Sequence, residues 1–143
     1  MKKSFLLAIA LPGKHLQTFE ARQVILPSKN GYIGFMAGRQ PLLATIEPGL
    51  ITIIDIKDHH LLFGTTGGFA EMIDNQASLL CDSVIEVKDL DLDEEKVPAG
   101  KIYNRDTSQM TEIQKREYVK LLMISQLRKK TAAGGASTMT ITE

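Results

Sequence analysis

The first 87 residues alternate between short apolar segments and turn-forming residues, and this spacing constrains the fold more than any other feature of the chain. Segments this short are typical of strands, because a globular helix usually needs about ten residues or more. Many short strands with regular turn signals indicate a β-sandwich or a β-barrel. Ten strands are expected, at residues 4–11, 15–19, 21–26, 32–36, 42–46, 50–56, 60–65, 68–73, 76–81 and 84–87.

Two of the turns carry residues that tolerate a positive φ angle. Asn30-Gly31 and Asp74-Asn75 each separate two apolar segments. Asparagine, aspartate and glycine adopt this backbone conformation at low cost. We therefore expect a tight hairpin at both positions.

The N-terminus imitates a secretory signal, because Lys2 and Lys3 precede the apolar run 5–11. That run is at the lower limit of length for a signal, and no small-x-small cleavage site follows it. We expect residues 3–11 to form the first strand, buried on both faces or nearly so; a cleaved signal peptide is the alternative. No stretch reaches the roughly 20 apolar residues that a membrane span needs.

The chain changes character at Lys88. The acidic run 89–95 could open a helix, since carboxylates favour a helix N-terminus. Pro98 and Gly100 follow closely and oppose a long helix. We expect at most a short helical turn near residues 91–97.

A stronger helical signal begins at Thr111, which has capping-box spacing to Gln114. The basic residues 128–130 suit the last turn of a helix, and Gly134-Gly135 is a stop signal. The expected helix has a broad apolar face, made of Met110, Ile113, Tyr118, Val119, Leu121, Leu122, Ile124 and Leu127.

Together these signals predict a mainly β fold with an α-helical addition. Residues 1–87 form the sandwich domain, residues 88–135 a C-terminal helical arm, and residues 136–143 a mobile tail without a clear contribution to the core.

Residue patterns of catalytic and metal sites are scarce. The three histidines lack zinc-site spacing, and the acidic run near Asp89 lacks the glycine and the final glutamate of a calcium loop. Cys81 is the lone cysteine, which excludes an intrachain disulfide, and we interpret it as a small buried hydrophobe. We expect no metal site and a binding protein rather than an enzyme.

Three motifs follow one another in the sandwich region. Residues 34–43 read Gly-Phe-Met-Ala-Gly-Arg-Gln-Pro-Leu-Leu, residues 47–53 read Glu-Pro-Gly-Leu-Ile-Thr-Ile, and residues 66–72 read Thr-Gly-Gly-Phe-Ala-Glu-Met. In this order and spacing they resemble the epsilon subunit of F-type ATP synthases, over roughly residues 4–97. Ala37, Arg39 and Glu47 stand where that family has proline, histidine and lysine.

The resemblance implies a ten-stranded β-sandwich followed by a helical hairpin. It implies a non-catalytic rotor subunit whose partners are the gamma subunit, the c-ring and, through the helical arm, the alpha/beta catalytic head. Coupling of rotation to ATP synthesis and inhibition of ATP hydrolysis by the arm follow from the same resemblance. So does a peripheral position on the cytoplasmic face of the inner membrane, for a bacterial source and through the complex alone.

Candidate contact residues are carried over by matching positions. Gamma-contact candidates are Arg39, Thr66 and Glu71. The turn that resembles the ring-facing loop supplies c-ring candidates, although a solvent-exposed hairpin tip is the alternative: Ser28, Lys29, Asn30, Gly31 and Tyr32.

The family's short ATP-binding motif is matched only weakly, by Asp93 and Lys96. Lysine in place of arginine loses the bidentate grip on phosphate, and Val97 is bulkier than the family's alanine. We expect no cofactor, with ATP as a regulatory ligand the weak alternative, and a first arm helix that is short or remodelled.

Two other functions remain to be compared. A free-standing β-sandwich enzyme or ligand binder would need clustered histidines or carboxylates on inward strand positions. A peripheral membrane or nucleic-acid binder could use the basic helix, but 17 basic and 17 acidic residues leave no net charge to attract nucleic acid.

Overall fold

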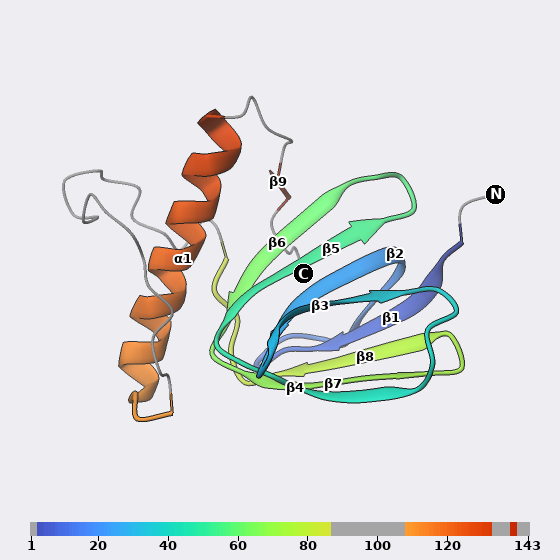
Figure 1. The fold of residues 1–143 in the computed structure, drawn as a ribbon, viewed down its shortest axis with the longest axis horizontal. Helices are drawn as coiled ribbons and strands as arrows, with labels where there is room; N and C mark the ends of the chain where they lie inside the picture. Colours follow the sequence, from blue (N-terminus) through green and yellow to red (C-terminus); the bar gives the residue numbers. More distant parts are fainter. Residues whose placement is uncertain (1–2, 87–107, 133–137, 140–143) are drawn as a thin grey trace.

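The computed structural model describes residues 3–86, 108–132 and 138–139. These residues form the strands and the helix that Figure 1 labels. Their bounds are β1 Phe5–Ala10, β2 Gln17–Ser28, β3 Gly31–Met36, β4 Leu42–Ile46, β5 Gly49–Asp55, β6 His60–Thr65, β7 Gly68–Ile73, β8 Gln76–Cys81, α1 Glu112–Ala132 and β9 Thr138–Met139.

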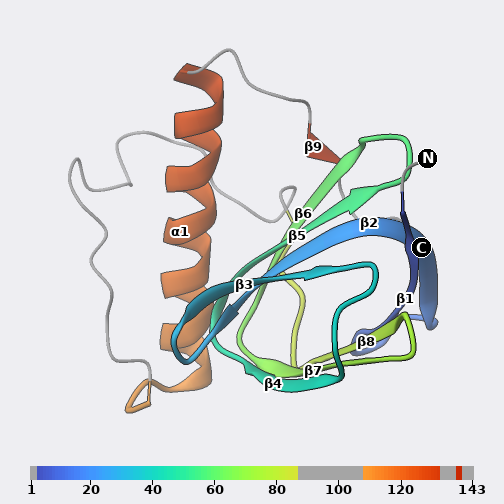
Figure 2. The same ribbon diagram turned by 45° about the vertical axis from the view of Figure 1, so that its right-hand side comes forward.

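The strands form one hydrogen-bonded sheet that curls into two layers. Its order is β4-β7-β8-β1-β2-β5-β6-β9, and β3 pairs with β2 beside this path. Figure 2 shows β2 curving away from β1 to join β3, β5 and β6 in the opposite layer. Phe35, Phe63, Leu7, Ile9 and Met72 are fully buried between the layers. The predicted β-sandwich is confirmed.

The strand count differs from the expected ten. Segments 15–19 and 21–26 merge into the single strand β2, whose register shifts between Ala21 and Gln23. No proline or glycine separates the two segments, so the chain continues through Glu20, and a bulge at Arg22 bends the strand instead of ending it. Of the expected strand 84–87, residues 84–86 are described, and they make only an isolated bridge between Gly64 and Ile85. The sandwich therefore has eight strands.

Both predicted hairpins are present. Asp74 and Asn75 have φ angles of 50° and 61°, and Gly31 has 109°. The Asn75 side chain also holds two loops together, because its Oδ1 accepts from Gly38 N at 3.0 Å and its Nδ2 donates to Ser4 O at 2.9 Å.

Strand β1 is buried on one face only, so the expectation of burial on both faces was wrong. Leu7 and Ile9 point into the core, whereas Leu6 is exposed. The reason is that none of the described residues covers the outer side of the β4-β7-β8-β1 layer.

Helix α1 begins where the capping box predicts. Thr111 N donates to Gln114 Oε1 at 3.0 Å, and Gln114 N donates to Thr111 Oγ1 at 3.2 Å. These reciprocal bonds satisfy backbone groups that the first turn leaves free.

The helix packs on the outer side of β5 and β6 (Figures 1 and 2). Tyr118, Val119 and Met123 join a second core cluster with Leu50, Leu62 and Ile85. The predicted apolar face is partly right: Tyr118, Val119 and Ile124 are buried, but Ile113 is 76% exposed because it lies on the side of α1 turned away from the sheet. Met123, which the sequence pattern did not single out, is fully buried.

Several expectations fall on residues outside the described ranges. They include the linker with Pro98 and Gly100, the weak ATP motif with Asp93 and Lys96, and most of the tail. Within the tail, Thr138–Met139 pairs parallel with β6, and the mobility of its other residues stays a prediction. No described helix is long and apolar enough to cross a membrane.

Candidate subunit-docking face

The outer side of the β4-β7-β8-β1 layer carries large apolar side chains that are 45% to 71% exposed. Most arise from strand alternation, since every second residue of a strand points to the same side, and Leu16 comes from the loop between β1 and β2. We call this surface the outer apolar face; it comprises Leu6, Leu16, Leu43, Phe69, Ile73 and Leu80. A patch of this kind on a folded domain typically marks a contact with another protein or a membrane.

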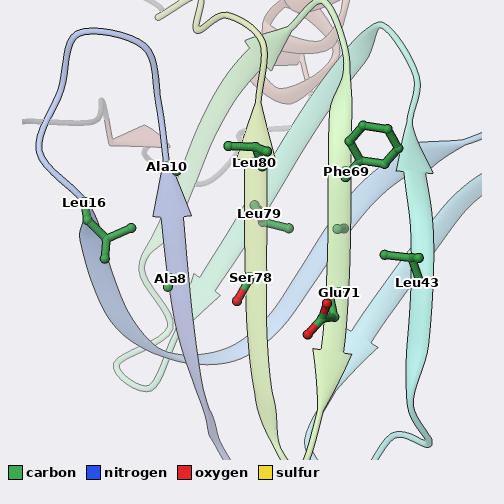
Figure 3. Close-up of a pocket in the computed structure, with 10 residues that line it drawn as sticks. Ala8, Ala10, Leu16, Leu43, Phe69, Glu71, Ser78, Leu79 and Leu80 are labelled. Atoms are coloured by element: carbon green, nitrogen blue, oxygen red, sulfur yellow. The ribbon is translucent and has the colours of Figure 1, made fainter.

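The outer apolar face contains a hollow of about 390 Å³. Small side chains on neighbouring strands form its floor, because Ala8 lies beside Ser78 in the register of β1 and β8, and Ala10 lies beside Leu80. Figure 3 shows Leu16 on one side of the hollow and Phe69 and Leu43 on the other. The hollow forms because short side chains lie between long ones.

Glu71 is the carboxylate that lines this hollow. On β7 it stands between Leu43 of β4 and Ser78 of β8, which are its direct register partners (Figure 3). Among the residues that the structure describes, it has neither a hydrogen-bond nor an ion-pair partner. Glu71 therefore presents a free negative charge within the outer apolar face.

The three gamma-contact candidates do not form one cluster. Arg39 lies in the loop after β3, where its Nη1 donates to Gly34 O at 3.2 Å and its guanidinium sits 5.8 Å from the Phe35 ring centre. Thr66 precedes β7 at the opposite end and is 2% exposed, with its hydroxyl 2.7 Å from Ser83 Oγ. Only Glu71 lies on the outer apolar face.

The c-ring candidates lie together at the hairpin between β2 and β3. Ser28 Oγ donates to Gly31 O at 2.7 Å and closes the turn. Tyr32 is 56% exposed, but its hydroxyl approaches Gly49 of β5. Burial of this hydroxyl raises the pKa of Tyr32, a hydrogen bond to the backbone of Leu50 opposes the rise, and Tyr118 of α1 adds to it. The hairpin tip therefore lies near the helix as well as the sheet.

The described residues hold no group of three or more His, Cys, Asp or Glu side chains that could bind a metal. Cys81 is buried, as expected, and burial raises the pKa of its thiol to about 12. A thiol with this pKa is protonated at neutral pH and is a poor nucleophile.

Comparison with known proteins decides the family. Residues 4–87 match the family model of the ATP synthase delta/epsilon chain β-sandwich domain. The ATP synthase epsilon chain of Chelativorans is 33% identical over 91 residues, which are 64% of this chain and 67% of the relative. The chain belongs to the ATP synthase epsilon chain family.

Another epsilon chain is similar in sequence, and two solved structures are similar in fold. The epsilon chain of Sinorhizobium fredii is 30% identical over 64% of this chain and 68% of its own. The fold is similar to a chain in the OSCP/F1/c-ring structure of the Euglena gracilis mitochondrial ATP synthase, with a TM-score of 0.60, 14% identity, and coverage of 88% and 80% of the two chains. It is also similar to a chain in the central stalk/c-ring structure of the Tetrahymena thermophila mitochondrial ATP synthase. That match has a TM-score of 0.53 and 18% identity, and it covers 92% of this chain and 93% of the other.

Sequence reasoning missed the outer apolar face as a surface. The apolar residues of β1 were expected to be buried on both sides, and Leu16 and Leu43 were placed in strands without a prediction that they are exposed. A signal was available in β7 and β8, where alternate residues on the side opposite the core include Phe69, Ile73 and Leu80.

Proposed function

We propose that this epsilon chain is a non-catalytic rotor subunit of an F-type ATP synthase that transmits rotation of the c-ring to the gamma subunit. The observation that carries the proposal is the outer apolar face. Exposed apolar surface of this extent on a well-packed layer is stabilised when another protein covers it.

In this proposal the outer apolar face docks on the gamma subunit. Glu71 lies inside the contact, and Arg39 is at its margin. Thr66 contributes through the turn that it stabilises, because its side chain is buried. An interface between permanent partners is expected to bury more than about 2,000 Å² in total.

The hairpin between β2 and β3 faces the c-ring in the same proposal. Its exposed residues Lys29, Asn30 and Gly31 are suited to polar contacts with the loops of the ring. The chain then reaches the membrane through the complex alone, on the cytoplasmic face if the source is a bacterium. Nucleic acid is not among its partners.

In the same proposal the helical arm regulates the enzyme. Helix α1 is docked on β5 and β6, and its release toward the alpha/beta head would inhibit ATP hydrolysis. We assign no cofactor, and we expect ATP binding at Asp93 and Lys96 to be weak. A chain ending near Lys88 should still couple but hydrolyse ATP faster in the reconstituted enzyme; unchanged hydrolysis would contradict the inhibitory role.

The rotor assignment is tested by affinity purification from the native membrane fraction. Co-elution with alpha, beta and gamma subunits is expected for the full chain. The double variant Leu43→Ser, Phe69→Ser should lose this co-elution, because both side chains belong to the outer apolar face. Ile113→Ser is the matched control, since Ile113 is equally apolar and exposed but lies on α1. The proposal would be contradicted if the full chain eluted as a monomer, or if the double variant still co-eluted with alpha, beta and gamma subunits.

A further inference from the structure

Glu71 has unusual neighbours for an exposed carboxylate. Phe69 and Ile73 flank it on β7, Leu43 stands beside it on β4, and Ser78 stands beside it on β8. The side chains around it are therefore mainly apolar, and this environment is suited to burial rather than to water.

The described part of the chain gives Glu71 no cation. Arg39 is held at Gly34 O and over the Phe35 ring, in a loop that the Gly38–Asn75 hydrogen bond ties to the turn after β7. No described side chain therefore balances the charge of Glu71 while the outer apolar face is uncovered.

Covering this face removes water from Glu71. A carboxylate that is buried without a partner costs far more than the apolar contacts around it contribute, whereas a paired and hydrogen-bonded carboxylate is tolerated. A positive charge placed at Glu71 offsets this cost most fully, since it supplies both a counter-charge and hydrogen-bond donors.

The hollow has room for a long basic side chain. Its volume is about 390 Å³, and its floor is made by Ala8, Ala10 and Ser78. Lysine and arginine have apolar stems that pack against surfaces of this kind while the charged end reaches a partner. Leu80, beside Ala10, offers an apolar wall for such a stem.

We infer that the gamma subunit places one lysine or arginine in the hollow, with its stem over Ala8 and Ala10 and its charged end on Glu71. The inference rests on the proposed function, because it concerns the same docking face. It assigns Glu71 a distinct role, which is to select a partner by charge, while the leucines and phenylalanine supply apolar area.

The inference is tested by whether one substitution, Glu71→Gln, weakens or strengthens binding to gamma. Affinity of the full chain for the cognate gamma subunit is measured by calorimetry for the unmodified chain and for Glu71→Gln. If gamma supplies a cation, Glu71→Gln leaves that cation buried and unpaired, and affinity should fall by about 30-fold or more. An unchanged or tighter affinity would overturn the inference, because removal of an unpaired buried charge should strengthen binding.

Three further variants separate the possible causes. Glu71→Asp keeps a carboxylate and should recover part of the affinity. Glu117→Gln removes an equal charge from α1, away from the face, and should leave affinity unchanged. Leu43→Ser tests the docking face itself: if it leaves affinity unchanged, the proposed docking face fails whatever Glu71 does. If Leu43→Ser weakens binding and Glu71→Gln does not, the docking face stands and the inferred cation fails.

Discussion

The two outer sides of the sandwich have different covers. On one side α1 lies over β5 and β6, and both faces of these strands are buried along most of their length. On the other side β7 and β8 alternate between buried and exposed residues, although several of the exposed ones are large and apolar. Within its described residues, the chain thus covers one apolar side itself and leaves the other exposed.

Small residues on the strands create a depression on each outer side of the sandwich. A Cβ atom at Gly64 would collide with Val119 and would lie 2.8 Å from Met123 Sδ. Ala8, Ala10 and Ser78 form the corresponding depression on the uncovered side. In the first case α1 fills the depression. By analogy, we expect a side chain of another subunit to fill the second one.

The largest effect should come from removing the side chain that fills the covered depression. Met123→Ala is expected to lower the free energy of unfolding by about 2–5 kcal/mol, because it creates a cavity between α1 and β6. Chemical denaturation followed by circular dichroism measures this change. A loss no larger than that of an exposed substitution would mean that α1 is not packed on the sheet in solution.

Adding a side chain at Gly64, on the sheet side of the same depression, should lower the free energy of unfolding by a smaller amount. Gly64→Ala is expected to destabilise the protein by about 1–3 kcal/mol through overpacking against Val119. Val119→Ala in the same chain should restore part of the loss, since it removes the atoms that collide. Additive effects of the two substitutions in a double-mutant cycle would argue against the contact.

The N-terminal cap of α1 should contribute about 1 kcal/mol. Thr111→Ala removes the hydroxyl that accepts from Gln114 N. Hydrogen exchange of the first-turn amides should accelerate more than exchange at the helix centre. Thr111→Ser retains the acceptor and should resemble the unmodified chain.

A smaller, pH-dependent effect is expected at the hairpin joining β5 and β6. Burial alone would raise the pKa of Asp55, but hydrogen bonds from the backbone N–H groups of His59 and Lys57 lower it overall. A lowered carboxyl pKa stabilises the fold above its unfolded value of about 4, and the contribution is lost as the pH falls through the folded value. The stability difference from Asp55→Asn should therefore shrink below about pH 4 in urea titrations; a constant difference would exclude this linkage.

The smallest effect on stability should occur on the uncovered side. Phe69→Ser and Leu80→Ser are expected to change the free energy of unfolding of the isolated chain by no more than about 0.5 kcal/mol, because both side chains face water. Their effect should appear only in gamma binding. A large loss of stability from either one would mean that another part of the chain covers this side, and the comparison between the two sides would fail.

Local signals predicted local structure well. Thr111 and Gln114 located the start of α1, and Asp74-Asn75 located a hairpin, since both depend on hydrogen bonds or backbone angles within a few residues. The merged strand β2 was missed because a bulge has no residue requirement as strict as that of a tight turn.

The outer apolar face was not predictable in the same way. An apolar residue has the same identity whether the chain or a partner covers it, so Leu6 and Leu43 could not be distinguished from core residues by pattern. Ile113 and Met123 show the related limit for α1, because the side of a helix that meets a sheet depends on its rotation in the tertiary structure. Glu71 came from the family resemblance, and its apolar neighbours became visible only through the register of β4, β7 and β8.

The bent strand β2 gives the sandwich a mechanical property. It is hydrogen-bonded to β1, β3 and β5 along its twelve residues, and it bends at the bulge where Arg22 pairs with Asp58. A sideways load on the hairpin at Gly31 enters β2 and β3 together and spreads through their ladders into both layers. Many hydrogen bonds then share the shear, and the ladder between β2 and β5 is irregular at the bulge beside Arg22.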